Sequence, residues 1–210
     1  VGDGDTGLNT GGMGAISPNL LADDELIKKV EDQIIQPTLQ GLKNRNYDYK
    51  GFIFLGLMII ESEPFVIEYN VRLGDPETQA ILPRIKTDLL SLLDKTTKGQ
   101  LASIDLKITD DFTATLVLVS SGYPGSYKKG EEISGLDEAG NNIIIFHAGT
   151  QLSNNKTITS GGRVLAVTSQ SSELEMAIEN IYKDSKGIQF TGKYNRSDIG
   201  KDMIKYGSQN

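Results

Sequence analysis

Residues 51–72, GFIFLGLMIIESEPFVIEYNVR, contain the clearest fold signal of the sequence, two strand patterns in succession. The continuous apolar run at 51–60 is typical of a buried strand, and residues 65–72 alternate apolar and polar side chains as a half-buried strand does. Only ESEP (61–64) separates the two runs. So short a turn predicts that they form an antiparallel hairpin.

The second of these strands divides into a polar and an apolar face, because side chains alternate along a strand. The polar face contains Val66, Glu68, Asn70 and Arg72. The opposite face, which we expect to enter a core, contains Phe65, Ile67, Tyr69 and Val71.

The polar face has the residue types that bind a metal ion beside a phosphate. A carboxylate and an amide oxygen two residues apart, here on Glu68 and Asn70, can bind one hard cation such as Mg²⁺. Arg72 follows at the next position of the face, where it could hold a phosphate oxygen or a developing negative charge. An ordinary strand with a solvated polar face has the same alternation, and spacing alone favours that simpler interpretation.

The segment GDPETQ (74–79) directly after this strand predicts the start of a helix, with Asp75 as N-cap and Pro76 at the first position. A helix N-terminus is also an anion site, and the acidic side chains Asp75 and Glu77 could hold a cationic amine. Composition alone favours the plain helix start.

The first 18 residues form a glycine-rich segment that we expect to be a loop. Within it, NTGGMG (9–14), which we call the glycine loop, offers backbone N–H groups in a nest suited to a carboxylate or phosphate. No Lys-Ser/Thr pair follows the glycines, so this is not a Walker A loop. A flexible tight turn would have the same composition.

The remaining pattern predicts a mixed α+β chain. A helix begins at Asp23 or Asp24, and Pro37 either breaks it or opens a second helix ending near Gly41. A further helix is expected at 87–97. After a boundary at 99–110 we expect three strands and one amphipathic helix, at 114–122, 142–149, 161–168 and 173–184.

Composition excludes several classes of protein. The chain has 210 residues, a net charge of −7 and no Cys, which argues against a nucleic-acid binder, a disulfide scaffold or a Cys-based zinc site. There is no run of 18 apolar residues and no targeting signal, so we expect no membrane partner and a cytoplasmic location. We expect no acid–base role for His147, and Arg163 is either a phosphate ligand or a surface cation.

Three segments together resemble the glycinamide ribonucleotide synthetase (phosphoribosylamine–glycine ligase) family of the ATP-grasp superfamily. They are DGDTGLNTGGMGAISP (3–18), VIEYNVRLGDPETQAILPRIKTDLL (66–90), and GYPGSY (122–127) with FHAGT (146–150) and GGRVLAVT (161–168). The resemblance covers nearly the whole chain in the right order, and the pair NTGGMG and GDPETQ is its most specific part.

The resemblance implies a fold and a reaction. Residues 1–100 would be the C-terminal portion of an ATP-grasp domain, an antiparallel sheet with helices, and residues 101–210 a small, mostly-β C-terminal domain with one amphipathic helix. The family joins glycine to 5-phosphoribosylamine through glycyl phosphate, with ATP as co-substrate and Mg²⁺ or Mn²⁺ as cofactor, in purine biosynthesis.

The resemblance also assigns roles to residues. Glu68 and Asn70 match the metal ligands, and Arg72 is the neighbouring basic, catalytic position. Substrate-facing residues are Asn9, Thr10, Gly11, Gly12, Met13, Gly14, Asp75, Pro76 and Glu77, and Arg163 is a candidate phosphate contact.

The family's chain is about twice as long, and its front portion carries the lid and the lysines that hold ATP. We therefore expect this chain, which begins at Val1, to be a C-terminal part that needs a missing N-terminal half for activity. Two alternatives stay open: a folded module that is non-catalytic alone, and an ATP-grasp carboxylate–amine ligase with another acceptor.

Overall fold

The computed structural model describes residues 1–140 and 142–207 and confirms a mixed α+β fold. The chain forms two compact units that interleave along the sequence. The sheet unit comprises the described residues of Val1–Pro18, Asp75–Arg84 and Thr109–Asn210, and the hairpin unit comprises Asn19–Gly74 and Ile85–Ile108. This is a different division from the predicted sequence domains 1–100 and 101–210, which stay a prediction.

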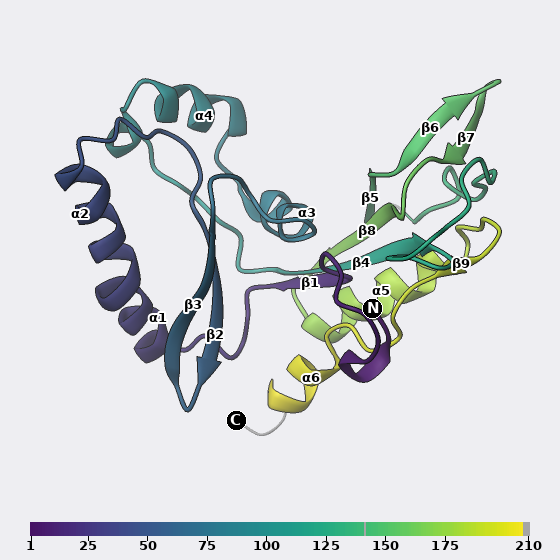
Figure 1. Ribbon diagram of the computed structural model, residues 1–210, viewed down its shortest axis with the longest axis horizontal. Helices are drawn as coiled ribbons and strands as arrows, with labels where there is room; N and C mark the ends of the chain where they lie inside the picture. The colour runs from purple at the N-terminus through teal and green to yellow at the C-terminus, as the bar shows by residue number, and fades with distance from the viewer. Residues whose placement is uncertain (141, 208–210) are drawn as a thin grey trace. The chain divides into compact units, whose positions relative to one another are not determined.

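An antiparallel sheet in the order β1-β4-β8-β5 is the centre of the sheet unit (Figure 1). Its strands are β1 (Gly14–Ser17), β4 (Phe112–Ser120), β8 (Arg163–Ser171) and β5 (Ile143–His147). The short β9 (Lys193–Tyr194) also pairs with β4, and β6 (Thr150–Ser153) pairs with β7 (Lys156–Thr159) in a separate hairpin. The three strands predicted after residue 110 are thus β4, β5 and β8.

Both faces of the two central strands, β4 and β8, are buried, and the core of β4 includes Thr113 and Thr115. Helix α5 (Leu174–Ser185) packs on β4 and β8 with an apolar stripe at helical spacing (Figure 1). Its side of the core includes Leu116, Leu118, Leu165, Ile178 and Ile181. The second cluster consists of Met13, Val117, Val119 and Ala166.

Two further elements are attached to the sheet unit. Helix α3 (Glu77–Ile81), continued by a 3-10 turn at Leu82–Arg84, is bonded to β4 because the Thr113 hydroxyl donates to the Ala80 carbonyl at 2.6 Å. The Arg84 guanidinium donates to the carbonyls of Asp111 and Thr109 and to the Ser17 hydroxyl. Helix α6 (Lys201–Gly207) follows β9, and a 3-10 turn (Asp3–Asp5) lies near the N-terminus.

The hairpin unit contains the predicted β2 (Phe54–Ile60) and β3 (Glu63–Asn70) pair. Helix α1 (Asp24–Val30) begins at the N-cap Asp23, whose carboxylate accepts from the Leu26 N–H, and continues through a π-helical turn (Glu31–Ile35) into α2 (Gln36–Asn44). Pro37 lies in the first turn of α2, as the second alternative predicts, but the helical run does not break there and α2 ends at Asn44 instead of near Gly41. Helix α4 (Leu89–Thr97) begins at the N-cap Asp88, and Leu101–Ser103 forms a 3-10 turn.

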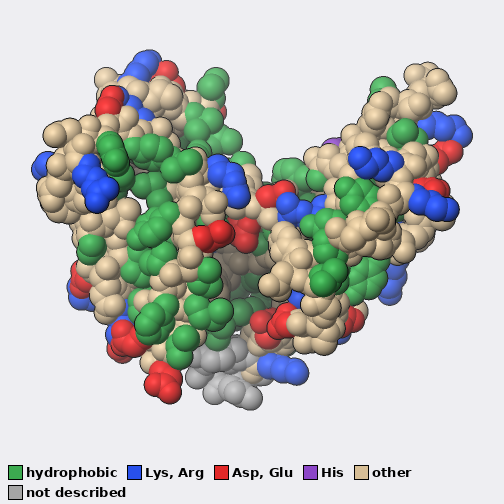
Figure 2. Space-filling model, in the orientation of Figure 1, with side chains coloured by type: hydrophobic (Ala, Val, Ile, Leu, Met, Phe, Trp, Pro, Cys, Tyr) green, Lys and Arg blue, Asp and Glu red, His purple; other side chains and the backbone are tan. Residues whose placement is uncertain are grey.

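The apolar face of β3 does not enter a core within the described chain, so that prediction is wrong. Ile67 is 63% exposed, Tyr69 52% and Val71 74%. Two polar contacts join the helical run to this face, since Lys29 pairs with Glu63 and the hydroxyls of Thr38 and Tyr69 lie 3.1 Å apart. A two-stranded hairpin with so little packed against it cannot bury its aliphatic side chains. Hydrophobic side chains accordingly gather on its surface in Figure 2.

The segment predicted as an N-terminal loop contains strand β1, which the sequence analysis missed, as it also missed β6, β7, β9 and α6. Gly14 pairs with Leu116 and Ser17 with Thr113. Among the described residues no helix has the length and apolarity to cross a membrane.

Removal of a core side chain of α5 tests the packing of the sheet unit. Ile181 is fully buried, so Ile181→Ala should lower the free energy of unfolding by about 2–5 kcal/mol. Met176 is on the same helix and 43% exposed, so Met176→Ala should change it by less than about 1 kcal/mol. Urea denaturation followed by circular dichroism measures both, and equal losses for the two variants would contradict this packing.

Candidate functional site

Three segments that are distant in the sequence meet in the sheet unit, and the sheet determines where each lies. The glycine loop (residues 9–14) leads into β1, residues 75–76 precede α3, and Arg163 begins β8 opposite Val119 of β4. Because β1 and β8 flank β4 and α3 is bonded to β4, the segments are anchored to one rigid element.

The Arg163 guanidinium joins these segments. Its Nη1 donates to the Asp75 carbonyl at 2.7 Å and to the Gly12 carbonyl at 3.2 Å, and its Nη2 donates to the Asp75 carboxylate at 2.8 Å. The other oxygen of that carboxylate accepts from the Gln79 side-chain amide at 2.9 Å. Both carboxylate oxygens of Asp75 therefore have partners within the chain.

Glycine is required in the loop because its backbone approaches the other two segments closely. A Cβ on Gly11 would lie 2.9 Å from Arg163 Cζ, and one on Gly12 would overlap Pro76 Cδ. Atoms this close cannot be accommodated without a shift of the loop or of the groups it contacts. The two glycines thus let the loop pack directly on the guanidinium and the proline.

The loop is anchored at its end by Met13. The Met13 side chain is buried beside Val117 and Val119, and its carbonyl accepts from the Val117 N–H at 3.0 Å. Asn9 is exposed and Thr10 is half-buried. Met13 therefore fixes the loop through its side chain, and the backbone of residues 9–12 is the part that remains for a ligand.

Asp75 is not the N-cap of the following helix, so that prediction is wrong. Helix α3 begins at Glu77, with Pro76 at the N-cap position. The Asp75 carboxylate accepts from Arg163 and from the Gln79 side chain. The ion pair to Arg163, a tertiary contact, replaces the local cap that the sequence pattern favours.

Glu68 and Asn70 lie together on β3 in the hairpin unit, as predicted. Glu68 pairs with Gly56 of β2, and a Cβ on Gly56 would lie 2.8 Å from Glu68 Cγ. The absence of a side chain at Gly56 leaves room for the Glu68 side chain over the neighbouring strand. The Asn70 amide nitrogen is buried and has no hydrogen-bond partner among the described residues.

This pair fits a hard divalent cation by the chemistry of its donors, a carboxylate and an amide oxygen. No group of three or more His, Cys, Asp or Glu side chains in the described part of the chain could hold a metal. Two protein ligands suit Mg²⁺, which keeps several waters and is usually completed by substrate phosphates.

Arg72 follows β3 and is exposed, with its Nη1 donating to the neighbouring Leu73 carbonyl at 3.2 Å. His147 is exposed at the end of β5, with Nδ1 2.9 Å from the Thr150 hydroxyl oxygen. The structure therefore groups the predicted residues into two clusters, one around Arg163 in the sheet unit and one on β3 in the hairpin unit.

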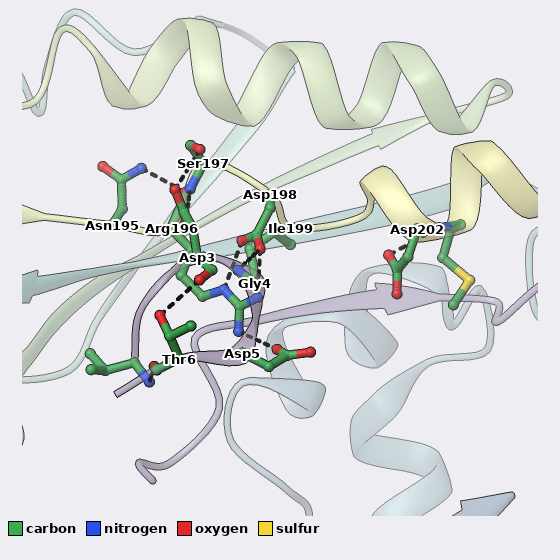
Figure 3. A network of polar contacts seen from close by, with 12 residues as sticks. Asp3, Gly4, Asp5, Thr6, Asn195, Arg196, Ser197, Asp198, Ile199 and Asp202 are labelled. Carbon is green, nitrogen blue, oxygen red and sulfur yellow. Dashed lines mark hydrogen bonds and ion pairs between the residues drawn. The ribbon is translucent and has the colours of Figure 1, made fainter. Parts of the chain in front are cut away.

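A second arginine attaches residues 3–5 to the segment just before α6, in the network drawn in Figure 3. Arg196 donates through Nε and Nη2 to Asp198 at 2.7 Å each and through Nη1 to Asp5 at 2.8 Å. Asp198 also accepts from the Gly4 N–H, and the Asp3 carboxylate accepts from the Ser197 N–H and hydroxyl. This network, which we call the terminal clasp, holds the residues just before the glycine loop.

The clasp perturbs its ionisable groups in the directions expected of ion pairs. Hydrogen bonds from the Arg196 side chain hold the pKa of Asp198 well below its usual range, and the Asp198 carboxylate raises the pKa of Arg196. Burial raises the pKa of Tyr182 to about 12. The Tyr182 hydroxyl oxygen accepts from the Ile199 N–H at 2.8 Å, next to the clasp.

Gln79 and the terminal clasp are parts of the structure that the sequence pattern does not predict. Gln79 is visible as part of GDPETQ, but only the fold shows that its amide holds Asp75. The clasp joins residues 194 positions apart, and no local pattern predicts that Asp3 and Ser197 are partners.

Two family models match the chain in succession. The ATP-grasp (A) domain of phosphoribosylglycinamide synthetase matches residues 1–78, and the C domain of the same enzyme matches residues 113–202. The chain belongs to the phosphoribosylglycinamide synthetase family.

Relatives within this family are similar along nearly the whole chain. A phosphoribosylamine–glycine ligase of Chlorobaculum tepidum is 43% identical over 97% of the chain and 48% of its own length. A bifunctional purine biosynthetic protein of Pichia angusta is 44% identical over 98% of the chain and 26% of its own length. The chain thus spans about half the length of the ligase, and less of the bifunctional relative.

Solved structures agree with the family. The crystal structure of the phosphoribosylamine–glycine ligase of Thermotoga maritima has a TM-score of 0.82 and 35% identity, over 94% of this chain and 49% of that one. The biotin carboxylase subunit of pyruvate carboxylase has a TM-score of 0.61 at 14% identity, over 87% of this chain and 40% of that one. The second likeness shows a shared fold alone.

Acid titration tests the terminal clasp. Because the folded-state pKa of Asp198 is lowered, its contribution to stability is present above its unfolded pKa of about 4 and is lost as the pH falls further. The melting temperature of the parent should therefore exceed that of Asp198→Asn by a margin that is constant above about pH 5 and shrinks below about pH 4.

Asp202→Asn is the matched control, because Asp202 lies in the first turn of α6, outside the clasp. At pH 7 its melting temperature should stay close to the parent's. A margin for Asp198→Asn that does not change with pH would contradict the ion pair.

Proposed function

We propose that this chain is the C-terminal half of a phosphoribosylamine–glycine ligase. The complete protein joins glycine to 5-phosphoribosylamine and hydrolyses ATP to ADP and phosphate, giving glycinamide ribonucleotide for de novo purine biosynthesis. The observation that carries the proposal is the identity of more than 40% to such ligases over nearly the whole chain. The intact Glu68, Asn70 and glycine loop support it.

The reaction has two steps that balance. A carboxylate oxygen of glycine attacks the γ-phosphorus of ATP, the bond to the bridging oxygen breaks, and glycyl phosphate and ADP form. The amine of phosphoribosylamine then attacks the acyl carbon, phosphate leaves, and the amine loses a proton. Neither step needs a protein nucleophile, and phosphoryl transfer depends chiefly on positioning and charge stabilisation.

In this proposal Glu68 and Asn70 hold Mg²⁺ or Mn²⁺ through their side-chain oxygens. The ion, when bound, neutralises phosphate charge. Arg72 follows the metal strand directly and stabilises the negative charge on the transferring phosphoryl group and the glycine carboxylate. The exposure of Glu68 supports the metal assignment, since it leaves the carboxylate accessible to an ion.

The substrates bind along the cluster of the sheet unit. The backbone N–H groups of the glycine loop suit a phosphate or carboxylate, and residues 75–77 lie beside the loop, with Pro76 packed on Gly12. A direct phosphate contact by Arg163 stays a prediction. It would use the guanidinium N–H groups that do not already donate to Gly12 and Asp75.

The partner of this chain is the remaining part of the same protein, which supplies the ATP lid. We propose that it covers the exposed aliphatic side chains of β3 and of the residue after it, among them Ile67 and Val71. Exposed apolar side chains gathered in one place mark an interaction surface.

The division into an ATP-grasp portion at 1–100 and a C-terminal domain at 101–210 belongs to this proposal, as does a cytoplasmic location. The chain alone is then an inactive folded module.

The metal assignment is tested in the full-length protein with Glu68→Gln. The change keeps the shape of the side chain but removes its charge, so kcat should fall by on the order of 10²-fold or more, and saturation should need far more Mg²⁺. Glycine- and phosphoribosylamine-dependent release of phosphate measures the rate, and the melting temperature should stay unchanged.

Glu63→Gln is the matched control, because Glu63 lies on the same strand but faces Lys29. It should keep parental turnover. Near-normal turnover of Glu68→Gln at limiting Mg²⁺ would refute the metal site, and phosphate release that depends on another amine would identify a different carboxylate–amine ligase.

A further inference from the structure

We propose that Arg163 is a positioning residue, a clamp that holds the glycine loop against residues 75–76 so that the two substrate-facing segments share one geometry. The effect of this clamp on catalysis rests on the proposed function. The contacts span 151 positions to Gly12 and 88 positions to Asp75. One side chain from β8 thus fixes two loops from the opposite part of the sequence.

An arginine is suited to this task because its planar guanidinium can donate in several directions at once. Nη1 and Nη2 both reach Asp75, one to the carbonyl and one to the carboxylate, and Nη1 also reaches Gly12. The Arg163 side chain is 22% exposed, so these charge-assisted bonds are stronger than those of a free surface pair. A lysine ammonium could not reproduce the planar fork.

The clamp is itself held firmly at each end. Arg163 is the first residue of β8, and its carbonyl accepts from the Gly149 N–H at 2.9 Å. On the opposite side, Gln79 donates to the second oxygen of the Asp75 carboxylate. The carboxylate is therefore fixed between two donors, and its charge is balanced by Arg163.

The position of the loop on the clamp depends on Gly11. A Cβ there would lie 2.9 Å from Cζ and 3.1 Å from Nη1 of Arg163, so alanine must displace either the loop or the guanidinium. The backbone of Gly11 does not lie in the left-handed region, and alanine has no other conformational obstacle. The Gly11→Ala substitution therefore disturbs the clamp while the Arg163 residue itself is kept.

The fold does not depend on this clamp. Helix α3 is already attached by the Thr113 hydroxyl and by Arg84, and the glycine loop by Met13. Arg84 provides the comparison, because its guanidinium also donates to two carbonyls but lies at the far end of α3. Loss of Arg84 should lower the stability of the fold. Loss of Arg163 should instead disturb the positions of the glycine loop and residues 75–76.

Kinetics of the full-length ligase test the clamp with Arg163→Gln, Arg163→Lys and Gly11→Ala. We expect kcat/KM for glycine or phosphoribosylamine to fall by on the order of 10²-fold in Arg163→Gln and Gly11→Ala, with melting temperatures close to the parent's. Arg163→Lys should recover little. The control Arg84→Gln should lower the melting temperature and leave kcat/KM per folded enzyme unchanged.

The decisive comparison is the double variant Gly11→Ala/Arg163→Gln. If the glycine acts only through the arginine, the double variant is no worse than Arg163→Gln alone. Additive losses, a parental kcat/KM in Arg163→Gln, or the same kinetic loss in Arg84→Gln would each overturn the clamp.

Backbone ¹⁵N relaxation of the 210-residue chain separates the clamp from the proposed function, because it needs no substrate. In Arg163→Gln, the order parameters of residues 9–12 should fall while those of β4 stay high. Unchanged order parameters in the loop would overturn the clamp. Lower order parameters in the loop together with a parent enzyme that cannot ligate glycine would support the clamp and refute the ligase assignment.

Discussion

Backbone hydrogen bonds along both edges of β4 hold the sheet unit together, and the position of each candidate residue in that unit depends on them. One edge carries β1, which ends the glycine loop, and the other carries β8, which begins at Arg163. The Thr113 hydroxyl of the same strand fixes α3 at Ala80. Segments separated by most of the chain are thereby brought within reach of one guanidinium, although each has only a short stretch of regular structure of its own.

This construction suits a reaction that depends on placement more than on acid–base chemistry. A carboxylate and a triphosphate must be brought together against their mutual repulsion, which requires cations and oriented N–H donors. In the proposed reaction Glu68 and Asn70 on β3 would hold the cation, Arg72 follows directly after that strand, and the backbone of the glycine loop can approach a ligand closely. Its one histidine, His147, lies exposed beside Thr150 and has no role in this account.

The sequence predicts the parts of this arrangement that depend on local pattern. The β2–β3 hairpin, the shared face of Glu68 and Asn70, and the amphipathic α5 all follow from periodicity. What covers a face is not a local property, so the expected burial of Ile67 and Val71 was wrong. The Asp75 side chain could equally cap a helix or form an ion pair, and only the pairing of β8 with β4 places Arg163 within reach of it. Strand β1 was missed because GAIS contains too little apolar alternation to distinguish it from the loop before it.

In the proposed reaction the complete protein activates glycine as an acyl phosphate. The most direct test gives the full-length enzyme glycine labelled with ¹⁸O in both carboxylate oxygens, together with ATP and phosphoribosylamine, and measures the mass of the phosphate released. Attack of the carboxylate on the γ-phosphorus predicts phosphate that carries one ¹⁸O from glycine. Unlabelled phosphate, formed at the same rate as glycinamide ribonucleotide, would contradict the account.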